Sequence, residues 1–238
     1  MVLIFCFICE RIRLFLLEKA QLTPNPVEPH STGLLVELHY LPCLDYISGL
    51  MQFGEVRLEA HEHYQKQSYR NRCYVRTANK VEALTVPVQQ GTHHQPIRDL
   101  RVANDQAWQM HHWRCLQAAY GKAPFFEYYA PDFELVYQKR WSFLFDLNYE
   151  LLTICLKQMR LKRSVSLTEW YNKASPVGLF DARSLMNPRN KPETYVFHRP
   201  VQYSQNFGVE FVSNLSIIDL LFCQGPAAMD VLKAGLRE

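Results

Sequence analysis

GLLVELHYLPCLDYISGLMQFGEVRLE, residues 33–59, is the stretch that decides the fold. Its first part, residues 34–38 (LLVEL), is a short apolar run after a glycine, which is typical of a buried strand. Residues 43–53 then carry apolar side chains at helical spacing, and Gly54 ends that segment. Residues 56–59 return to a strand pattern. This strand–helix–strand succession favours an α/β fold.

The rest of the chain continues the alternation. Strands are predicted at residues 73–77, 84–88, 97–102 and 165–170, helices at 105–120, 124–137, 142–161 and 215–222, and a long proline-containing loop at 172–200. We therefore predict a single α/β domain over residues 33–238, with a mixed or mostly parallel sheet and helices on both faces. Residues 1–32 end in a proline-rich linker and are expected to be an appendage outside the core.

The composition limits which kinds of binding partner can be expected. The net charge of +3 and the pI near 8.4 are too mildly basic to indicate nucleic-acid binding. The apolar run at the amino terminus is interrupted at Glu10 and Arg11, so no stable membrane span is expected. Seven dispersed cysteines predict reduced thiols in a cytoplasm. The Cys6–Cys9 pair has no second pair to complete a metal site, and no sequence motif calls for a cofactor.

Several segments together resemble the WbqC-like protein family. They are ELHYLPCLDYI at 37–47, QKQSYRNR at 65–72, LTVPV at 84–88, W-x-x-x-H at 108–112, YGKAPFFEYY at 120–129, YSQ at 203–205 and NLSIIDLLFCQG at 214–225. The resemblance implies an association with O-antigen and related surface-polysaccharide genes, and a glycyl-transfer role has been suggested for the family. One departure is that Val36-Glu37-Leu38 stands where the family often has His-Gln-Pro, so no role of that histidine can be transferred.

Glu37 is the most informative polar residue of the first half, because an unpaired charge inside an apolar strand is costly. Ligands of open α/β sheets bind beyond the carboxyl ends of strands, where His39 and Tyr40 also lie. We interpret Glu37 as a catalytic general base or substrate clamp, and His39 and Tyr40 as binding residues. The alternative is a charge on an edge strand facing water.

A second group of candidates follows from the polar loop before residue 73. Arg72 offers a planar fork for carboxylate or phosphate, and Asn71 can orient a carbonyl. With Lys66 as a further catalytic candidate, this loop is expected to hold an anionic donor. The alternative is a solvated loop with a structural arginine–carboxylate pair. At least three of Glu37, Lys66, Asn71, Arg72 and His112 are expected to converge on one concave surface.

The resemblance adds residues from the later segments. His112 lies on an apolar helix stripe and is either a catalytic residue or a hydrogen-bonded core histidine. Asp219 interrupts an apolar run and must be hydrogen-bonded if buried. Tyr203 and Gln205 share one face of an extended chain. Together with Tyr120, these last three are the further substrate-binding candidates.

Three functions are compatible with these patterns. The first is a group transferase that acts on an activated sugar or acyl donor in surface-polysaccharide biosynthesis; the 13 tyrosines suit a sugar or nucleotide pocket. The second is a non-catalytic binding or accessory module of the same pathway. The third is a metal-dependent hydrolase that would use His39, His61 and His63. The oligomeric state is not determined by these patterns.

Overall fold

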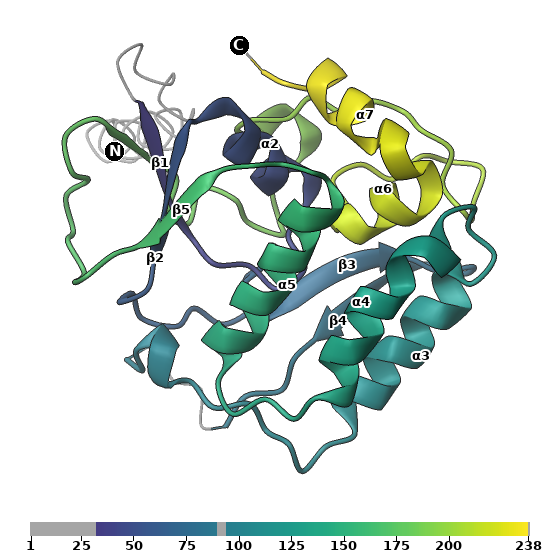
Figure 1. The fold of residues 1–238 in the computed structure, drawn as a ribbon, viewed down its shortest axis with the longest axis horizontal. Helices are drawn as coiled ribbons and strands as arrows, with labels where there is room; N and C mark the ends of the chain where they lie inside the picture. The colour runs from purple at the N-terminus through teal and green to yellow at the C-terminus, as the bar shows by residue number, and fades with distance from the viewer. Residues whose placement is uncertain (1–31, 90–93, 238) are drawn as a thin grey trace, which may run out of the picture.

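The computed structural model describes residues 32–89 and 94–237 (Figure 1). Its centre is a parallel sheet with the strand order β5-β2-β1-β6. The strands are β1 (Gly33–Glu37), β2 (Glu55–Glu59), β5 (Ser164–Leu167) and β6 (Leu179–Asp181). All three strand pairs are parallel, and Glu37 is the Cα partner of Glu59. The predicted α/β fold with a mostly parallel sheet is confirmed.

Side-chain alternation gives this sheet one apolar face. Leu34 and Val36 of β1 and Val56 and Leu58 of β2 are fully buried in the main hydrophobic core. Helix α2 (Leu44–Gln52) connects β1 to β2 and contributes to the same core. Burial of such aliphatic side chains contributes about 1.5–3 kcal/mol each, which orients the sheet toward the helices.

The opposite face of the sheet is polar. It carries the charged side chains of Arg57 and Glu59 next to Leu35. The chain between Thr168 and Pro176 lies over these residues. In Figure 1 this loop occupies the side of β1 and β2 away from α2 and α5. Within the part of the chain that the structure describes, helices thus cover one face of the sheet, whereas the sequence pattern favoured both. The expected appendage of residues 1–32 lies outside the described residues except for Thr32.

The remaining elements pack around the apolar face. A two-stranded antiparallel sheet pairs β3 (Arg72–Arg76) with β4 (Val81–Thr85). The helices are α3 (Trp108–Tyr120), α4 (Phe126–Gln138), α5 (Leu144–Gln158), α6 (Ile217–Gln224) and α7 (Ala228–Ala234), with short 3-10 turns at Ile97–Asp99, Pro192–Thr194 and Gly225–Ala227. Helix α4 runs through Pro131 without a break.

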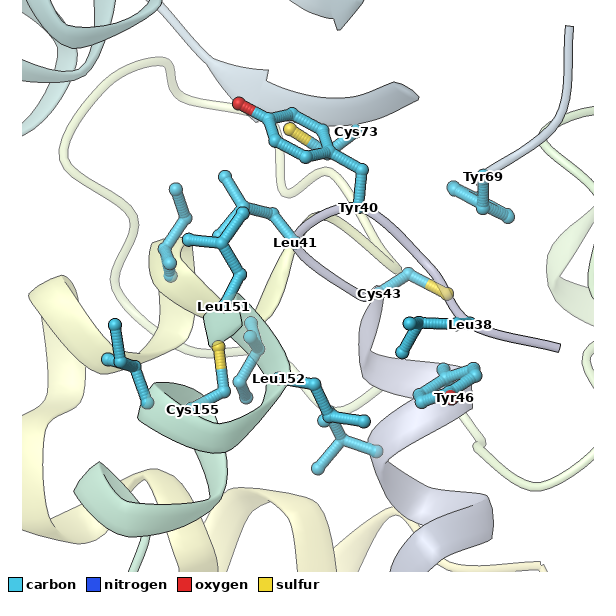
Figure 2. Packing of buried hydrophobic residues seen from close by; sticks show 14 of the residues in the cluster. Leu38, Tyr40, Leu41, Cys43, Tyr46, Tyr69, Cys73, Leu151, Leu152 and Cys155 are labelled. Carbon is cyan, nitrogen blue, oxygen red and sulfur yellow. The ribbon is translucent and has the colours of Figure 1, made fainter. Parts of the chain in front are cut away.

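The segment that follows β1 is itself part of the core. Tyr40 and Leu41 are completely buried, and Figure 2 shows them between α5, represented by Leu151 and Cys155, and Cys73 of β3. The five described cysteines are free thiols, and burial raises the pKa of Cys73 well above its ordinary value. Cys6 and Cys9 lie outside the described residues.

Three local predictions differ from the structure. Residues 97–102, predicted as a strand, form a 3-10 turn over Ile97–Asp99 followed by isolated bridges at Arg101 and Val102. Helix α3 begins at Trp108 without a side-chain cap, so Asp105 does not start it. Strand β6 lies inside the predicted loop of residues 172–200, because three residues are too few to show a periodic pattern.

Candidate functional site

Two carboxylates end the central strands of the parallel sheet. Glu37 closes β1 and Glu59 closes β2, and the two side chains are 0% and 1% exposed. They lie at the carboxyl edge, where open α/β sheets bind ligands. Because isolated buried charges are strongly unfavourable, each carboxylate needs partners, and these partners define the local structure.

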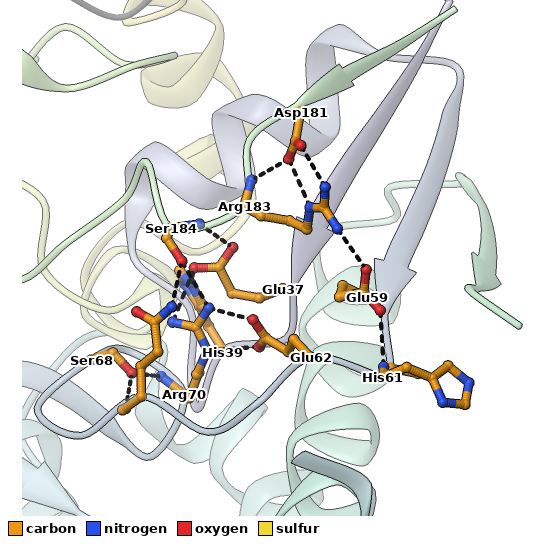
Figure 3. Close-up of polar contacts among 12 residues, drawn as sticks. Glu37, His39, Glu59, His61, Glu62, Ser68, Arg70, Asp181, Arg183 and Ser184 are labelled. Carbon is orange, nitrogen blue, oxygen red and sulfur yellow. Dashed lines mark hydrogen bonds and ion pairs between the residues drawn. The ribbon is translucent and has the colours of Figure 1, made fainter. Parts of the chain in front are cut away.

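Arg70 is the partner that joins Glu37 to Glu62 (Figure 3). Its Nε and Nη2 donate to the two carboxylate oxygens of Glu62 at 2.6 Å each, and its Nη1 lies 3.5 Å from Glu37 Oε1. Glu37 Oε2 accepts the backbone N–H of Ser184 at 2.9 Å, and its Oε1 lies 3.3 Å from His39 Nε2. All three ion-pair members are at most 5% exposed, so this network is closed to a large ligand.

One guanidinium therefore serves two carboxylates, and their pKa values move apart. Burial alone would raise the pKa of Glu37, but Arg70, His39 and the Ser184 N–H outweigh it and lower the pKa to about 2. Burial raises the pKa of Glu62 to about 7, against the opposing effect of Arg70. Burial also lowers the pKa of His39, so this imidazole is neutral at pH 7. Glu62 is therefore the member of this network whose charge changes near pH 7.

Glu59 belongs to a second network on the polar face of the sheet. Its Oε1 accepts the Thr168 hydroxyl at 2.8 Å and the His61 N–H at 2.9 Å, and its Oε2 accepts Arg183 Nη1 at 3.0 Å. Arg183 also forms a two-pronged pair with Asp181, at 2.9 and 2.7 Å. Arg183 also donates to the carbonyls of residues 172 and 173, and these bonds hold the loop that follows β5 against the sheet edge.

A cavity of about 530 Å³ opens beside this second network, a size in the range of small-molecule sites. Glu59 and Arg183 are fully engaged, and Arg57 Nη2 donates to Glu55 Oε1 at 2.7 Å. Among the lining residues, Ser166, Glu169 and Trp170 are then free to meet a ligand. Trp170 is 66% exposed, which is unusual for a large aromatic side chain. The cavity lining is Leu35, Arg57, Glu59, Ser166, Leu167, Thr168, Glu169, Trp170, Asn172, Pro176 and Arg183.

His112 lies in a separate buried chain of hydrogen bonds. The Tyr40 hydroxyl is 2.8 Å from His112 Nδ1 and 2.6 Å from the Tyr137 hydroxyl. Burial lowers the pKa of His112 to about 4, so its ring is neutral at pH 7 and its Nδ1 shares one hydrogen bond with the Tyr40 hydroxyl. Burial also raises the pKa of Tyr40 well above its ordinary value. This arrangement braces α3 and α4 against the segment after β1.

The polar loop before β3 does not form a common anion site. The Asn71 amide donates to the Val86 carbonyl at 2.9 Å, and Arg72 Nε donates to the Thr85 hydroxyl at 3.0 Å. Lys66 is exposed. Glu37 and His112 are buried in different networks, and none of four cavities of about 530 to 840 Å³ among the described residues is lined by Glu37, Lys66, Asn71, Arg72 or His112, so the structure does not bring the expected three or more of these residues together in one of them.

Four of the later candidates do meet. Asp219 accepts the Tyr120 hydroxyl at 2.7 Å, the Tyr203 hydroxyl at 2.6 Å and the Gln205 amide at 3.2 Å. Asp219 is fully buried at the start of α6, and these bonds tie α3 and the segment around residue 205 to that helix. Charge-assisted bonds of this kind are stronger than neutral ones, so the cluster stabilises the packing of α3 on α6.

The three histidines of the metal hypothesis are not brought together. His39 is buried beside Glu37, whereas His63 is exposed. Across residues 32–89 and 94–237, no group of three or more His, Cys, Asp or Glu side chains has an arrangement that could hold a metal ion. The same described residues include no helix long and apolar enough to cross a membrane.

Sequence reasoning missed Arg70, Glu59, Arg183 and Trp170. Strand alternation contains no signal for Arg70: it lies before β3 and shares the parity of Arg72, which points away from the core, yet Arg70 is buried. Glu59 ends the predicted strand after Gly54, at the same edge as Glu37. Arg183 and Trp170 lie beside strands that are too short or too irregular to be placed without the structure.

The fold and the contacts at the carboxyl edge of the sheet define the class of protein. It is an α/β protein whose parallel sheet carries two arginine–carboxylate networks and a cavity at its carboxyl end. A family model described as the WbqC-like protein family matches residues 38–176 and 165–231. The chain therefore belongs to the WbqC-like protein family. It is also 27% identical over 224 residues to "Uncharacterized protein Rv1507c" of Mycobacterium tuberculosis, covering 84% of this chain and 96% of that protein. No solved structure matches significantly.

Proposed function

We propose that this protein is a group transferase that acts on an activated sugar or acyl donor in the biosynthesis of bacterial surface polysaccharides. The observation that carries the proposal is the cavity at the carboxyl edge of the sheet, with the exposed ring of Trp170 beside it. An aromatic face beside several hydrogen-bonding side chains suits a polyhydroxylated ligand. The family resemblance supplies the polysaccharide context.

Each free group of the cavity has a role in this proposal. Trp170 stacks on the apolar face of a sugar ring, and the Ser166 hydroxyl binds its oxygens. The Arg57 guanidinium pairs with Glu55 through Nη2, and its remaining N–H groups bind an anionic leaving group. During transfer the acceptor loses a proton as it attacks the donor. The exposed carboxylate of Glu169 is the general base for that proton. Glu59 and Arg183 act as positioning residues, since their hydrogen bonds hold the loop that bears Trp170.

The test is a binding screen against nucleotide sugars and activated acyl donors, read out as an increase in Tm. We expect at least one donor to raise the Tm of the wild type, and Trp170→Ala to abolish that increase. Met110→Ala is the matched control, because Met110 is 45% exposed on α3 and does not line the cavity. Equal increases in wild type and Trp170→Ala would refute the site.

A second candidate function, a non-catalytic binding module, is favoured by a specific observation. The buried carboxylates Glu37, Glu59 and Asp219 are all engaged by donors within the protein. Only Glu169 is then left as the free acid of the cavity. A donor that binds without release of its leaving group would identify a module. Release that is lost in Glu169→Gln, with donor binding retained, would identify a transferase.

A further inference from the structure

A second concave surface lies at the carboxyl end of helix α5, away from the cavity of Trp170. Two hollows meet there, one of about 840 Å³ and one of about 820 Å³, and both are lined by Lys157 and Arg160. The first is walled by α4, the 3-10 turn Gly225–Ala227 and α7, and the second continues from α5 into β5. Each volume is within the range of ligand sites.

The charged side chains that line this surface are all positive. Its lining includes five cations and no aspartate or glutamate. Lys157 pairs with Asp132 at 3.1 Å, and Lys233 lies 3.9 Å from Asp230. Among the described residues, Arg160, Lys162 and Arg163 have no carboxylate within ion-pair distance. A helix carboxyl terminus attracts cations, but only through a partial charge of about one half. Arg163 donates to the backbone carbonyls of residues 50, 51 and 162, so Arg160 and Lys162 supply the positive charges left for a ligand.

The backbone at Arg160 gives independent support. The Leu161 N–H donates to the Leu156 carbonyl at 2.9 Å and the Arg160 N–H to the Lys157 carbonyl at 3.0 Å, which is the Schellman ending of a helix. Arg160 occupies its left-handed position, with φ +54°. Glycine is favoured there because a Cβ atom is unfavourable in this conformation. An exposed arginine at this position is thus not explained by local stability, and such strain accompanies functional sites.

The first hollow also has an apolar interior. Met159, Leu221 and Ala228 form buried walls, and Met229 and Phe125 are half-buried at its sides. Tyr128 is 70% exposed at the same hollow. A contiguous apolar surface beside uncompensated cations matches a ligand that is apolar at one end and anionic at the other.

From this arrangement we infer that the surface binds a single-chain anionic amphiphile as a monomer, for example an alkyl phosphate. The anionic head contacts Arg160 and Lys162, and the alkyl chain lies in the hollow between Tyr128 and Met229. The inference is independent of the transferase proposal, since none of these residues lines the Trp170 cavity.

Isothermal titration calorimetry of the full chain with decyl phosphate, below its micelle concentration, tests the inference. We expect saturable binding that weakens with added salt, as ion contacts are screened. The double variant Arg160→Gly with Lys162→Gln should weaken binding at least tenfold. Arg160→Gly alone should leave the Tm unchanged or raise it. Tyr128→Ala should weaken binding of decyl phosphate several-fold.

The control variant is Arg140→Gln, which removes an exposed cation outside both hollows and should bind like the wild type. Inorganic phosphate and decanol are titrated alone. Equal affinity for inorganic phosphate would show a head-group site without a tail and overturn the inference. Binding only to vesicles of anionic phospholipid, with none to decyl phosphate, would replace the monomer site by a membrane surface and also overturn it.

Discussion

At the scale of single residues, Arg70 determines the charge balance of the sheet edge. Its guanidinium is 1% exposed and faces both Glu37 and Glu62. A buried ion pair adds little net stability by itself, but removal of one partner leaves the other charge without compensation. The local structure after β1 is therefore sensitive to Arg70 and much less sensitive to its exposed neighbours.

Arg70→Ala should reduce the free energy of unfolding by about 3–5 kcal/mol, because two buried carboxylates lose their guanidinium. Arg72→Ala is the matched control: Arg72 is half-buried, has no carboxylate partner and bonds only to a threonine hydroxyl, so we expect a loss below about 1 kcal/mol. Urea denaturation measures both. Similar losses for the two variants would contradict the role given to Arg70.

A pH prediction follows from Glu62. Its folded-state pKa of about 7 is above the ordinary value of 4.5, so the folded protein binds more protons than the unfolded chain between these values. The stability from this group is present below pH 4.5 and is lost as the pH rises through 7. Relative to Glu62→Gln, the wild type should become progressively less stable from pH 4.5 to 7. A constant difference in unfolding free energy over that range would show that Glu62 stays ionised.

The residue scale also shows what the sequence could and could not predict. Glu37 was predictable, because a charge inside an apolar strand requires partners. Its partner was not, since Arg70 and Arg72 stand in one polar segment and Arg70 lies in the loop before β3, where no periodic pattern predicts the direction of a side chain. His112 and Asp219 were predictable as hydrogen-bonded buried groups, but their partners Tyr40 and Tyr203 come from distant segments.

At the scale of elements, regular periodicity was the feature that could be read without the structure. Strands β1 and β2 and helix α2 follow the predicted ranges to within about two residues, because burial of one face fixes their pattern. Strand β6 has three residues, and its position depends on pairing with β1 and on the Asp181–Arg183 contact. Such tertiary determinants leave no local pattern, and the cavity that the adjoining loop creates was unpredictable for the same reason.

The Asp219 cluster links elements, and its contribution can be measured. Tyr203→Phe removes one hydrogen bond to a buried carboxylate, so we expect a loss of about 1.5–3 kcal/mol in the free energy of unfolding. Tyr195→Phe removes a neutral bond to the Ser213 hydroxyl at 3.2 Å and should cost less, about 0.5–1.5 kcal/mol. If Tyr203→Phe were neutral while ligand binding fell, Tyr203 would be a ligand-facing residue and not a brace.

At the scale of the whole molecule, the described elements form a continuous core in which β1 has a partner on each side. Strand β2 pairs with one edge of β1 and β6 with the other. The chain enters the sheet through Thr32 and Gly33, whose N–H groups both donate to the Gly178 carbonyl. The family match begins just after β1, at residue 38. We therefore propose that the fold starts near residue 32.

A chain that starts at Thr32 should accordingly fold with nearly the same stability as the full chain. It keeps both bonds to Gly178 and every residue of β1, so Tm should change by less than about 3 °C, equivalent to roughly 1 kcal/mol at this size. A chain that starts at Glu37 is the control: it lacks Leu34 and Val36, which are fully buried, and should show no cooperative unfolding. Differential scanning calorimetry distinguishes the two. A large drop in Tm for the chain starting at Thr32 would place residues 1–31 in the core, because only lost burial or lost sheet pairing could produce it.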